Sequence, residues 1–181
     1  MSVIGLTRAV IVVDMINDFV YGKFGSERAR GIIPSISRLL ETARTKGYLI
    51  IFTRDAHKTD DPEMKIWGEH AMKGTSGSEV IPDLNIQKGD HVIEKSTYSS
   101  FFNTELDSVL KRHSVDEVII VGVTTDICVR HTAADAFFRG YKIIIPKECV
   151  QTISDEIQEK ALDEMRRLYR AEIWDLERVI A

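Results

Sequence analysis

The chain has 181 residues, 44% of them hydrophobic, and a formal net charge of −4 at pH 7. This length and composition fit a single globular domain over residues 1–181, which is long enough to bury a sizeable core. The slight acidity gives no electrostatic basis for binding nucleic acid or an anionic membrane surface, so we expect neither partner.

Apolar runs along the chain are short. None approaches the roughly 18 residues of a membrane span. The run Ala9–Val13 is too short for a signal peptide, and Asp14 interrupts it. We therefore expect a cytoplasmic protein, in which Cys128 and Cys149 stay reduced rather than forming a disulfide.

These short runs alternate with helical patterns. The runs predict six buried strands at Ala9–Val13, Tyr48–Thr53, His91–Glu94, Glu117–Val123, Tyr141–Ile145 and Ala171–Trp174. The patterns predict helices from Pro34 to the stop at Gly47, and over Glu105–Arg112, Thr125–Arg139 and Asp155–Tyr169. The alternation indicates an α/β fold with a doubly wound, six-stranded, mostly parallel sheet and helices on both faces. A closed barrel of eight such units would need more strands.

One connection, at about residues 56–89, is much longer than the others and is rich in glycine and proline. Connections of this length without regular structure are usually either functional or disordered. Because this one contains Trp67 and Met72, we expect an ordered loop excursion from the single domain.

Polar residues stand where the predicted strands end. Asp14 ends the first, Asp55 and His57 follow the second, Lys95 follows the third, and Cys128 comes shortly after the fourth. Taken singly, such residues are commonly turn formers, solvated charges or small buried hydrophobes. Ligands in open α/β sheets bind beyond the carboxyl ends of the strands. The shared location therefore favours a functional site.

Cys128 lies in the first turn of the helix predicted over Thr125–Arg139, beside this edge, which suits a nucleophile. Only the thiolate attacks well, and a helix N-terminus or a nearby Lys95 stabilises it. Asp14 can take the thiol proton and later return it to a leaving group. Backbone N–H groups of the turn before Cys128 can hold an oxyanion. A Cys128–His131 pair, one helical turn apart, is the alternative.

A metal site is the second hypothesis at this edge. Asp55 and His57 are two residues apart in an extended segment, so their side chains share one side of it. With His70 from the long connection they offer two imidazoles and a carboxylate, which can bind Zn²⁺ and leave open positions. Glu69 is a competing or additional ligand, and the alternative reading is two polar loop histidines.

Five segments together resemble one family, the isochorismatase-like cysteine hydrolases, which include the metal-binding nicotinamidases. They are VDMINDF (13–19), TRDAH (53–57), GEHAMKGTSGSE (68–79), EKSTYSSFFNTEL (94–106) and VGVTTDICVRHTAADA (121–136). The resemblance implies a six-stranded parallel sheet, a catalytic triad and a metal site. The residues it implies are Asp14, Lys95 and Cys128 for the triad, and Asp55, His57 and His70 for the metal. It also implies a cis peptide between Val123 and Thr124, with the N–H groups of Thr124 and Cys128 as the oxyanion hole.

Three positions depart from the nicotinamidase pattern. Ile16 stands where the pattern has Gln, Ala56 where it has Trp, and Ala71 where it has Cys. The triad is untouched by these changes, which bear instead on the choice of substrate. Isochorismatase itself resembles this fold but lacks the cysteine, so Cys128 argues against vinyl-ether cleavage.

The resulting expectation is a cysteine-dependent amidohydrolase that cleaves a C–N bond of a small amide through a thioester, with nicotinamide as the first substrate. The expected cofactor is zinc or another divalent metal, and Phe19, Trp67 and Tyr98 are candidate pocket walls. We expect a small-molecule amide as the binding partner, namely the substrate. We also expect the protein to form a homo-oligomer.

Two alternatives stay open. An N-carbamoyl compound, as in N-carbamoylsarcosine amidase, would be favoured if Arg54 or Arg130 reached the pocket to meet a carboxylate. A thiol redox or binding protein would use Cys128 with Cys149, although these two are not in a C-x-x-C arrangement.

Overall fold

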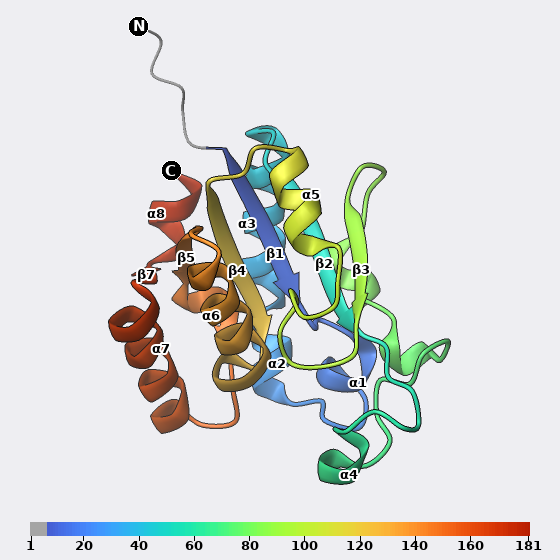
Figure 1. Cartoon of the computed structure of the whole chain (residues 1–181). Coiled ribbons are helices and arrows are strands. Elements are labelled where there is room, and N and C mark those ends of the chain that lie inside the picture. The colour runs from blue at the N-terminus through green and yellow to red at the C-terminus, as the bar shows by residue number, and fades with distance from the viewer. Residues whose placement is uncertain (1–6) are drawn as a thin grey trace, which may run out of the picture.

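Seven parallel strands form one sheet in the computed structural model, which describes residues 7–181. Six of them follow the order β3-β2-β1-β4-β5-β7 (Figure 1). These are β1 (Arg8–Val13), β2 (Leu49–Asp55), β3 (His91–Lys95), β4 (Glu117–Val123), β5 (Lys142–Pro146) and β7 (Glu172–Trp174). The predicted α/β sheet is therefore confirmed, with one strand more than expected.

The additional strand is β6 (Val150–Gln151), which pairs with the last two residues of β4. Two residues are too few to give a periodic sequence signal, so the pattern of apolar runs did not reveal it. By continuing beside β4, this short strand brings the segment that follows β5 to the edge of the sheet where Cys128 lies.

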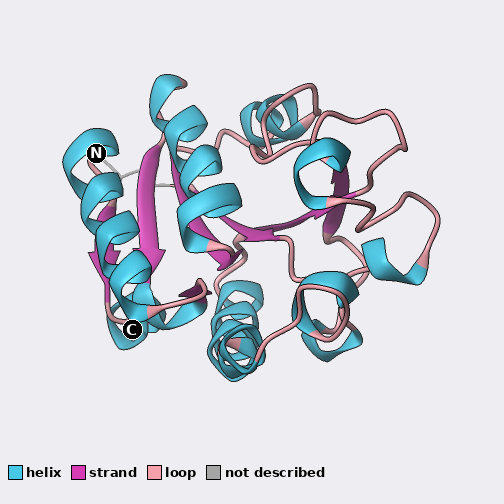
Figure 2. Cartoon of the chain, turned by 90° about the horizontal axis from the view of Figure 1, so that it is seen from below, coloured by secondary structure: helices cyan, strands magenta, loops and turns pink. Residues whose placement is uncertain are grey.

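Helices cover both faces of the sheet (Figures 1 and 2). Two buried clusters show which helix covers which face. One contains side chains from α5 (Leu106–Arg112), α6 (Arg130–Phe138) and α7 (Asp155–Tyr169). The other contains side chains from α2 (Glu27–Gly31), α3 (Ile33–Thr45) and α8 (Leu176–Ile180).

Alternate side chains of β1 pack into the two hydrophobic clusters on opposite faces of the sheet. Ala9, Ile11 and Val13 belong to the first cluster, and Val10 and Val12 to the second. Successive side chains of a strand point to opposite faces, so a strand covered on both sides must be apolar throughout. The run AVIVV, from Ala9 to Val13, meets that requirement.

The strand order places a topological switch point between β1 and β4. The chain runs from β1 outward through β2 and β3, then returns to add β4 on the other side of β1. Ligands bind at such a point because the flanking connections leave on opposite faces of the sheet. Asp14 follows β1 and Cys128 follows β4, so the switch point separates the two elements that carry them.

β1 and β4 approach each other closely at Gly122. This residue pairs with Val13 and has φ of 114°, and an added Cβ would lie 2.0 Å from the carbonyl oxygen of Val13. Only glycine has both the conformational freedom and the lack of side-chain bulk that this contact requires. Gly122 thus lets Asp14 lie beside the turn that leads to Cys128.

The long connection is ordered, as the sequence predicts. It contains α4 (Met64–Trp67) and two 3₁₀ turns, Ser76–Ser78 and Pro82–Leu84. Short bridges between His57 and Met72, and between Ile16 and Val80, tie it to the end of the sheet. Across residues 7–181, none of the helices combines the length and apolarity needed to cross a membrane.

Candidate active site

Three ionisable side chains meet beneath the switch point. Nζ of Lys95 lies 2.8 Å from Oδ2 of Asp14 and 2.6 Å from Oδ1 of Asp55, and it also donates to the carbonyl oxygen of Thr97 at 3.0 Å. The N–H of Asp55 donates to Oδ1 of Asp14 at 2.9 Å. The ends of three neighbouring strands therefore build one buried charge cluster, because parallel strands bring their carboxyl ends to the same edge.

Asp14 has a left-handed backbone, with φ of 53°. Residues other than glycine adopt this conformation rarely, and it recurs at functional sites. The N–H of Asp14 still donates to the carbonyl of Thr53 at 2.9 Å. Its Oδ2 is buried and has no hydrogen bond of good geometry despite the nearby ammonium. This oxygen is available to accept a proton.

Cys128 lies in a π-helical turn, Thr125–Val129, that joins β4 to α6. The thiol is buried, and its sulfur lies within 4.8 Å of a carboxylate oxygen of Asp14. The peptide bond between Val123 and Thr124 is cis, as the family resemblance implies. The sequence predicts an α-helix starting at Thr125. In the structure the first turn of this helix is π-helical, which is wider than an α-helical turn.

Burial dominates the protonation equilibria of the cluster. It raises the pKa of Asp14 to about 7, with the charge of Asp55 adding to the effect and Lys95 opposing it. Burial would also raise the pKa of Asp55, but Lys95 and His57 hold that pKa below its usual value. Of the two carboxyl groups beside Lys95, Asp14 is the one that titrates near neutrality.

The thiol of Cys128 is kept neutral by the same environment. Burial raises its pKa well above the ordinary range, although the Lys95 ammonium acts in the opposite direction. A preformed thiolate, as expected from a helix N-terminus, is therefore not the resting state. For this thiol to act as a nucleophile, its proton would have to leave at the moment of attack, and Asp14 is the adjacent carboxyl group that could accept it.

Four buried side chains form a second cluster next to the first. One potential ligand atom from each of Asp55, His57, Glu63 and His70 lies within 4.8 Å of the others. Nε2 of His57 has no hydrogen-bond partner, and it lies 3.5 Å from Oδ2 of Asp55 and 3.7 Å from Oε2 of Glu63. An orphaned buried nitrogen between two carboxylates is the environment that a cation would complete.

Both imidazoles, those of His57 and His70, make their hydrogen bond through Nδ1, which leaves Nε2 available to bind a metal. Nδ1 of His57 lies 3.0 Å from Oδ2 of Asp61, and Nδ1 of His70 lies 2.7 Å from the carbonyl oxygen of Gly68. These oxygens accept hydrogen bonds, so Nδ1 carries the proton and Nε2 keeps its lone pair. Metal-binding histidines have the same outer hydrogen bond, and two imidazoles with two carboxylates suit a divalent ion.

The predicted ligands Asp55, His57 and His70 are thus brought together, and Glu63 joins them. Sequence reasoning missed Glu63 and considered Glu69, which is exposed and takes no part in the cluster. Glu63, the residue before α4, belongs to no periodic pattern or motif in the sequence. Only the path of the excursion, which folds back over the end of β2, selects one glutamate over the other.

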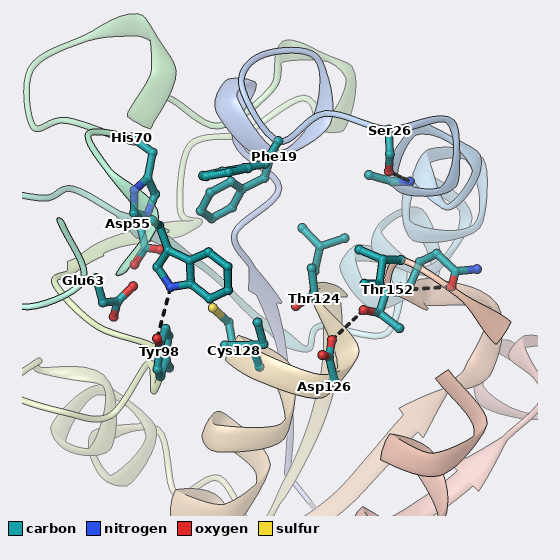
Figure 3. A pocket seen from close by; sticks show the side chains of 17 residues that line it. Phe19, Ser26, Asp55, Glu63, His70, Tyr98, Thr124, Asp126, Cys128 and Thr152 are labelled. Carbon is teal, nitrogen blue, oxygen red and sulfur yellow. Dashed lines mark hydrogen bonds between the residues drawn. The ribbon is translucent and has the colours of Figure 1, made fainter. Parts of the chain in front are cut away.

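A cavity of about 330 Å³ opens above both clusters, and Figure 3 shows its lining side chains. Cys128, Asp55, Glu63 and His70 lie on its wall, together with Val123 and Thr124. Asp14 and Lys95 are buried and do not line the cavity. A volume at the small end of the range for ligand pockets fits a small molecule.

Aromatic rings form much of the cavity wall. The three aromatic candidates from the sequence, Phe19, Trp67 and Tyr98, all line it, and Phe24 adds a fourth ring. Nε1 of Trp67 donates to the Tyr98 hydroxyl at 3.2 Å, which ties α4 to the loop after β3 (Figure 3). This wall offers flat apolar surface beside the thiol.

Positive side chains do not line the cavity: among its lining residues, all within the described range 7–181, there is no Lys or Arg. Arg54 pairs with Glu79 and Glu94, and Arg130 pairs with Glu164. Neither arginine is therefore placed to meet a substrate carboxylate. The positions that depart from the nicotinamidase pattern, Ile16, Ala56 and Ala71, are buried outside the cavity lining.

His131 and Cys149 lie away from the thiol chemistry. Nδ1 of His131 donates to the carbonyl of Ile127 at 2.7 Å, and its ring packs against Tyr98 without lining the cavity. Cys149 belongs to the hydrophobic cluster on the α3 side of the sheet, while Cys128 belongs to the cluster on the α6 side. A Cys128–Cys149 disulfide would have to cross the sheet, and both cysteines are free.

Comparison with known proteins places this geometry in a family. The family model described as the isochorismatase domain matches residues 8–177. The chain belongs to the isochorismatase family. It is a hydrolase of that family, as the predicted resemblance implied.

Solved structures of family members share both fold and length. The N-carbamoylsarcosine amidase from Thermoplasma acidophilum is 39% identical, with a TM-score of 0.90 over 95% of this chain and 98% of that one. The pyrazinamidase of Pyrococcus horikoshii, solved in complex with zinc, is 31% identical, with a TM-score of 0.87 over 93% and 98%. Nicotinamidase 3 of Arabidopsis thaliana is 32% identical over 160 residues, 85% of this chain and 78% of that protein.

Proposed function

We propose that this hydrolase cleaves the C–N bond of a small amide, with Cys128 as nucleophile and Asp14 as proton carrier. The observation that carries the proposal is the thiol on the cavity wall, within 4.8 Å of a buried Asp14 carboxylate oxygen; burial raises the pKa of that carboxyl group to about 7. A proton acceptor with a pKa near the working pH is the most effective general base.

In the first half-reaction, Sγ of Cys128 bonds to the amide carbonyl carbon as the thiol proton moves to Asp14. The carbonyl oxygen becomes an oxyanion, which the backbone N–H groups of Thr124 and Cys128 are proposed to stabilise. The intermediate collapses when the C–N bond breaks. The departing nitrogen takes the proton from Asp14, and ammonia leaves a thioester on Cys128.

In the second half-reaction, a water molecule gives one proton to Asp14 and bonds to the thioester carbon. The C–S bond then breaks, the carboxylic acid product forms, and the sulfur recovers its proton from Asp14. Lys95 stays charged throughout, since Asp14 and Asp55 raise its pKa despite its burial. Its role is electrostatic, because it favours the ionised forms of Asp14 and the sulfur.

Asp55, His57, Glu63 and His70 would hold a divalent metal, with zinc as the first choice because two imidazoles are present. When bound, the ion would supply a Lewis acid at the cavity wall that can take a donor atom of the substrate or a water molecule. The zinc-bound pyrazinamidase relative supports this choice.

Nicotinamide is the substrate we propose first. It is flat, aromatic and uncharged, which suits a cavity walled by four aromatic rings with no lysine or arginine. Its ring nitrogen is a donor atom of the kind a divalent metal accepts. The sequence similarity to a nicotinamidase and a pyrazinamidase agrees with this choice.

A carbamoyl compound is the second candidate. It is favoured by the 39% identity to an N-carbamoylsarcosine amidase over nearly the whole chain. The polar end of the cavity, with Ser26, Asp126, Gln151 and Thr152, can hydrogen-bond a ureido group. A free carboxylate on such a substrate would find no cationic side chain on the cavity wall.

Ammonia release tests these proposals directly. Purified protein, loaded with zinc, is assayed with nicotinamide, benzamide and N-carbamoylsarcosine, and the Cys128→Ala variant is the control. We expect nicotinamide to be hydrolysed best, and benzamide, which lacks the ring nitrogen, to be a poorer substrate. A preference for N-carbamoylsarcosine would select the second candidate, and no cysteine-dependent ammonia from any amide would reject the function.

A further inference from the structure

Three buried hydroxyl groups are joined by hydrogen bonds between the elements that carry the charge cluster and Cys128. We call Thr53, Ser100 and Thr132 the hydroxyl cluster. Oγ1 of Thr53 and Oγ of Ser100 are 2.8 Å apart, and Oγ1 of Thr132 donates to Oγ of Ser100 at 3.1 Å. The N–H of Ser100 donates back to Oγ1 of Thr132 at 3.0 Å. All three side chains are fully buried.

Each member of the cluster belongs to an element that also carries a proposed catalytic or metal-binding residue. Thr53 lies two residues before Asp55 on β2, on the same side of that strand. Ser100 lies in the loop that leaves β3 just after Lys95. Thr132 lies four residues after Cys128, on the same side of its helical segment.

Thr53 also contacts the general base through its backbone, since its carbonyl oxygen accepts the N–H of Asp14 at 2.9 Å. A second contact joins the same loop and helix, because Ser99 Oγ donates to Oδ2 of Asp135 one turn further along α6. The elements that carry Asp14, Lys95 and Cys128 are thus linked below the site by hydrogen bonds. Apolar packing alone is not directional and would leave their mutual register less defined.

We propose that the hydroxyl cluster is a positioning device that holds the Cys128 thiol in register with Asp14 and Lys95. None of its members lines the cavity, so it acts on proton transfer from the thiol rather than on substrate binding. The inference rests on the proposed roles of Cys128 and Asp14, but not on the identity of the amide. Thr53, Ser100 and Thr132 are positioning residues, because they act through the groups above them.

The test compares variants that change the hydroxyl with variants that keep it. Thr132→Val keeps the shape of the side chain and removes the hydroxyl, whereas Thr132→Ser keeps the hydroxyl. Ser78→Ala is the matched control, because Ser78 is also fully buried but its hydroxyl donates only to the Thr75 carbonyl, away from the site. Circular dichroism and thermal melting establish that each variant is folded.

Two readouts separate this inference from the proposed function. The first is kcat and KM on the best amide. The second is the rate at which iodoacetamide alkylates Cys128, which needs no substrate. Tryptic digestion places Cys128 in the peptide spanning residues 113–130 and Cys149 in the peptide spanning residues 148–160, so mass spectrometry distinguishes the two thiols.

For Thr132→Val we expect kcat to fall about 10- to 100-fold with KM changed less than about two-fold, since misplacing a reacting group costs rate rather than binding. Alkylation of Cys128 should slow in the same variant. Thr132→Ser and Ser78→Ala should keep near wild-type values of both. Combining Thr53→Val with Thr132→Val should cost less than the product of the single effects, because both act through Ser100.

Three results would overturn the inference: a folded Thr132→Val with normal kcat and normal alkylation, a Thr132→Ser as slow as the valine variant, or an equal loss in Ser78→Ala. Ser100→Ala takes the place of Thr132→Val if the latter does not fold, and it is judged by the same two readouts. If no amide is hydrolysed by wild type, the proposed function fails, while the alkylation rates still decide whether the hydroxyl cluster positions the thiol.

Discussion

Nζ of Lys95 lies 2.8 Å from Oδ2 of Asp14, and both side chains are completely buried. Asp55 places a second carboxylate on the same ammonium, at 2.6 Å. One positive charge therefore faces two acids, and two ionised carboxylates at such close range are disfavoured. Burial, together with this competition, raises the pKa of Asp14 to about 7, which suits its proposed role as the proton carrier.

The first prediction concerns the two cysteines. Cys128→Ala should lower kcat about 10³-fold or more, because the thioester can no longer form. Cys149→Ala should leave kcat within about two-fold of wild type, since truncating a buried side chain on the other face of the sheet affects stability rather than the site. Ammonia release and thermal melting of both variants test this. Retention of a tenth of the wild-type rate by Cys128→Ala would contradict the assignment of the nucleophile.

The second prediction is a pH dependence. Asp14 must be ionised to accept the thiol proton, and its pKa is raised to about 7. Activity should therefore fall as the pH drops from 8 to 6, with a midpoint close to that pKa. The measurement is kcat/KM for the best amide across this range, with circular dichroism confirming that the fold persists at pH 6. A flat profile would mean that Asp14 is not the group that takes the proton.

The third prediction follows from the position of Lys95. Its charge lowers the pKa of both Asp14 and Cys128, although burial outweighs it in each case. Lys95→Met keeps the aliphatic stem and removes the charge. We expect a lower kcat and a pH profile whose midpoint moves to higher pH, because both groups become harder to ionise. An unmoved profile with a normal rate would place Lys95 outside the mechanism.

The fourth prediction concerns stability rather than rate. A carboxyl group whose pKa is higher in the folded state contributes stability that is present at low pH and is lost as the pH rises through the folded pKa. For Asp14 that loss should occur between about pH 4 and 7 or slightly above. Asp14→Asn has no such loss, so its melting temperature relative to wild type should be higher at pH 8 than at pH 5. An equal difference at both values would argue against a raised pKa.

Much of the fold follows from sequence, because buried parallel strands must be apolar on both faces. Glu117–Val123 was predicted with the bounds of β4, and Asp155–Tyr169 with those of α7. The features that were missed include the short helices α2, α4 and α8, and two that carry no periodic signal. β6 has only two residues, and the π-helical turn at Thr125–Val129 has the composition of an ordinary first helical turn.

Part of the candidate site could also be predicted from the sequence, for a related reason. The carboxyl ends of parallel strands converge, so Asp14, Asp55 and Lys95 could be brought together from strand positions alone. Glu63 and the hydroxyl cluster could not, since glutamate, serine and threonine are common in loops and only the three-dimensional path of the chain buries these ones. The raised pKa of Asp14 also depends on burial, which residue types alone do not give.

The last prediction concerns the metal. Purified protein should take up one divalent ion, and Glu63→Gln should weaken its binding, because an orphaned Nε2 of His57 lies 3.7 Å from that carboxylate. Asp61→Asn should weaken binding about 10- to 100-fold, the usual effect of losing an outer partner of a ligand histidine. Binding should also weaken as the pH falls, because the ligands must give up protons. Glu69→Gln is the matched control, since Glu69 adjoins His70 but is exposed.

Metal content and zinc titration of the folded variants measure these effects without an assay of activity. We expect Glu69→Gln to bind as wild type does and Glu63→Gln to bind less. His57→Ala should lose the ion while keeping its fold, because His57 lies two residues beyond the last residue of β2, outside the strands of the sheet. Equal losses in the Glu63 and Glu69 variants would remove Glu63 from the site. Wild type that takes up no ion from added zinc would refute the cluster as a metal site and would shift the substrate proposal toward carbamoyl compounds, which need no donor atom for a metal.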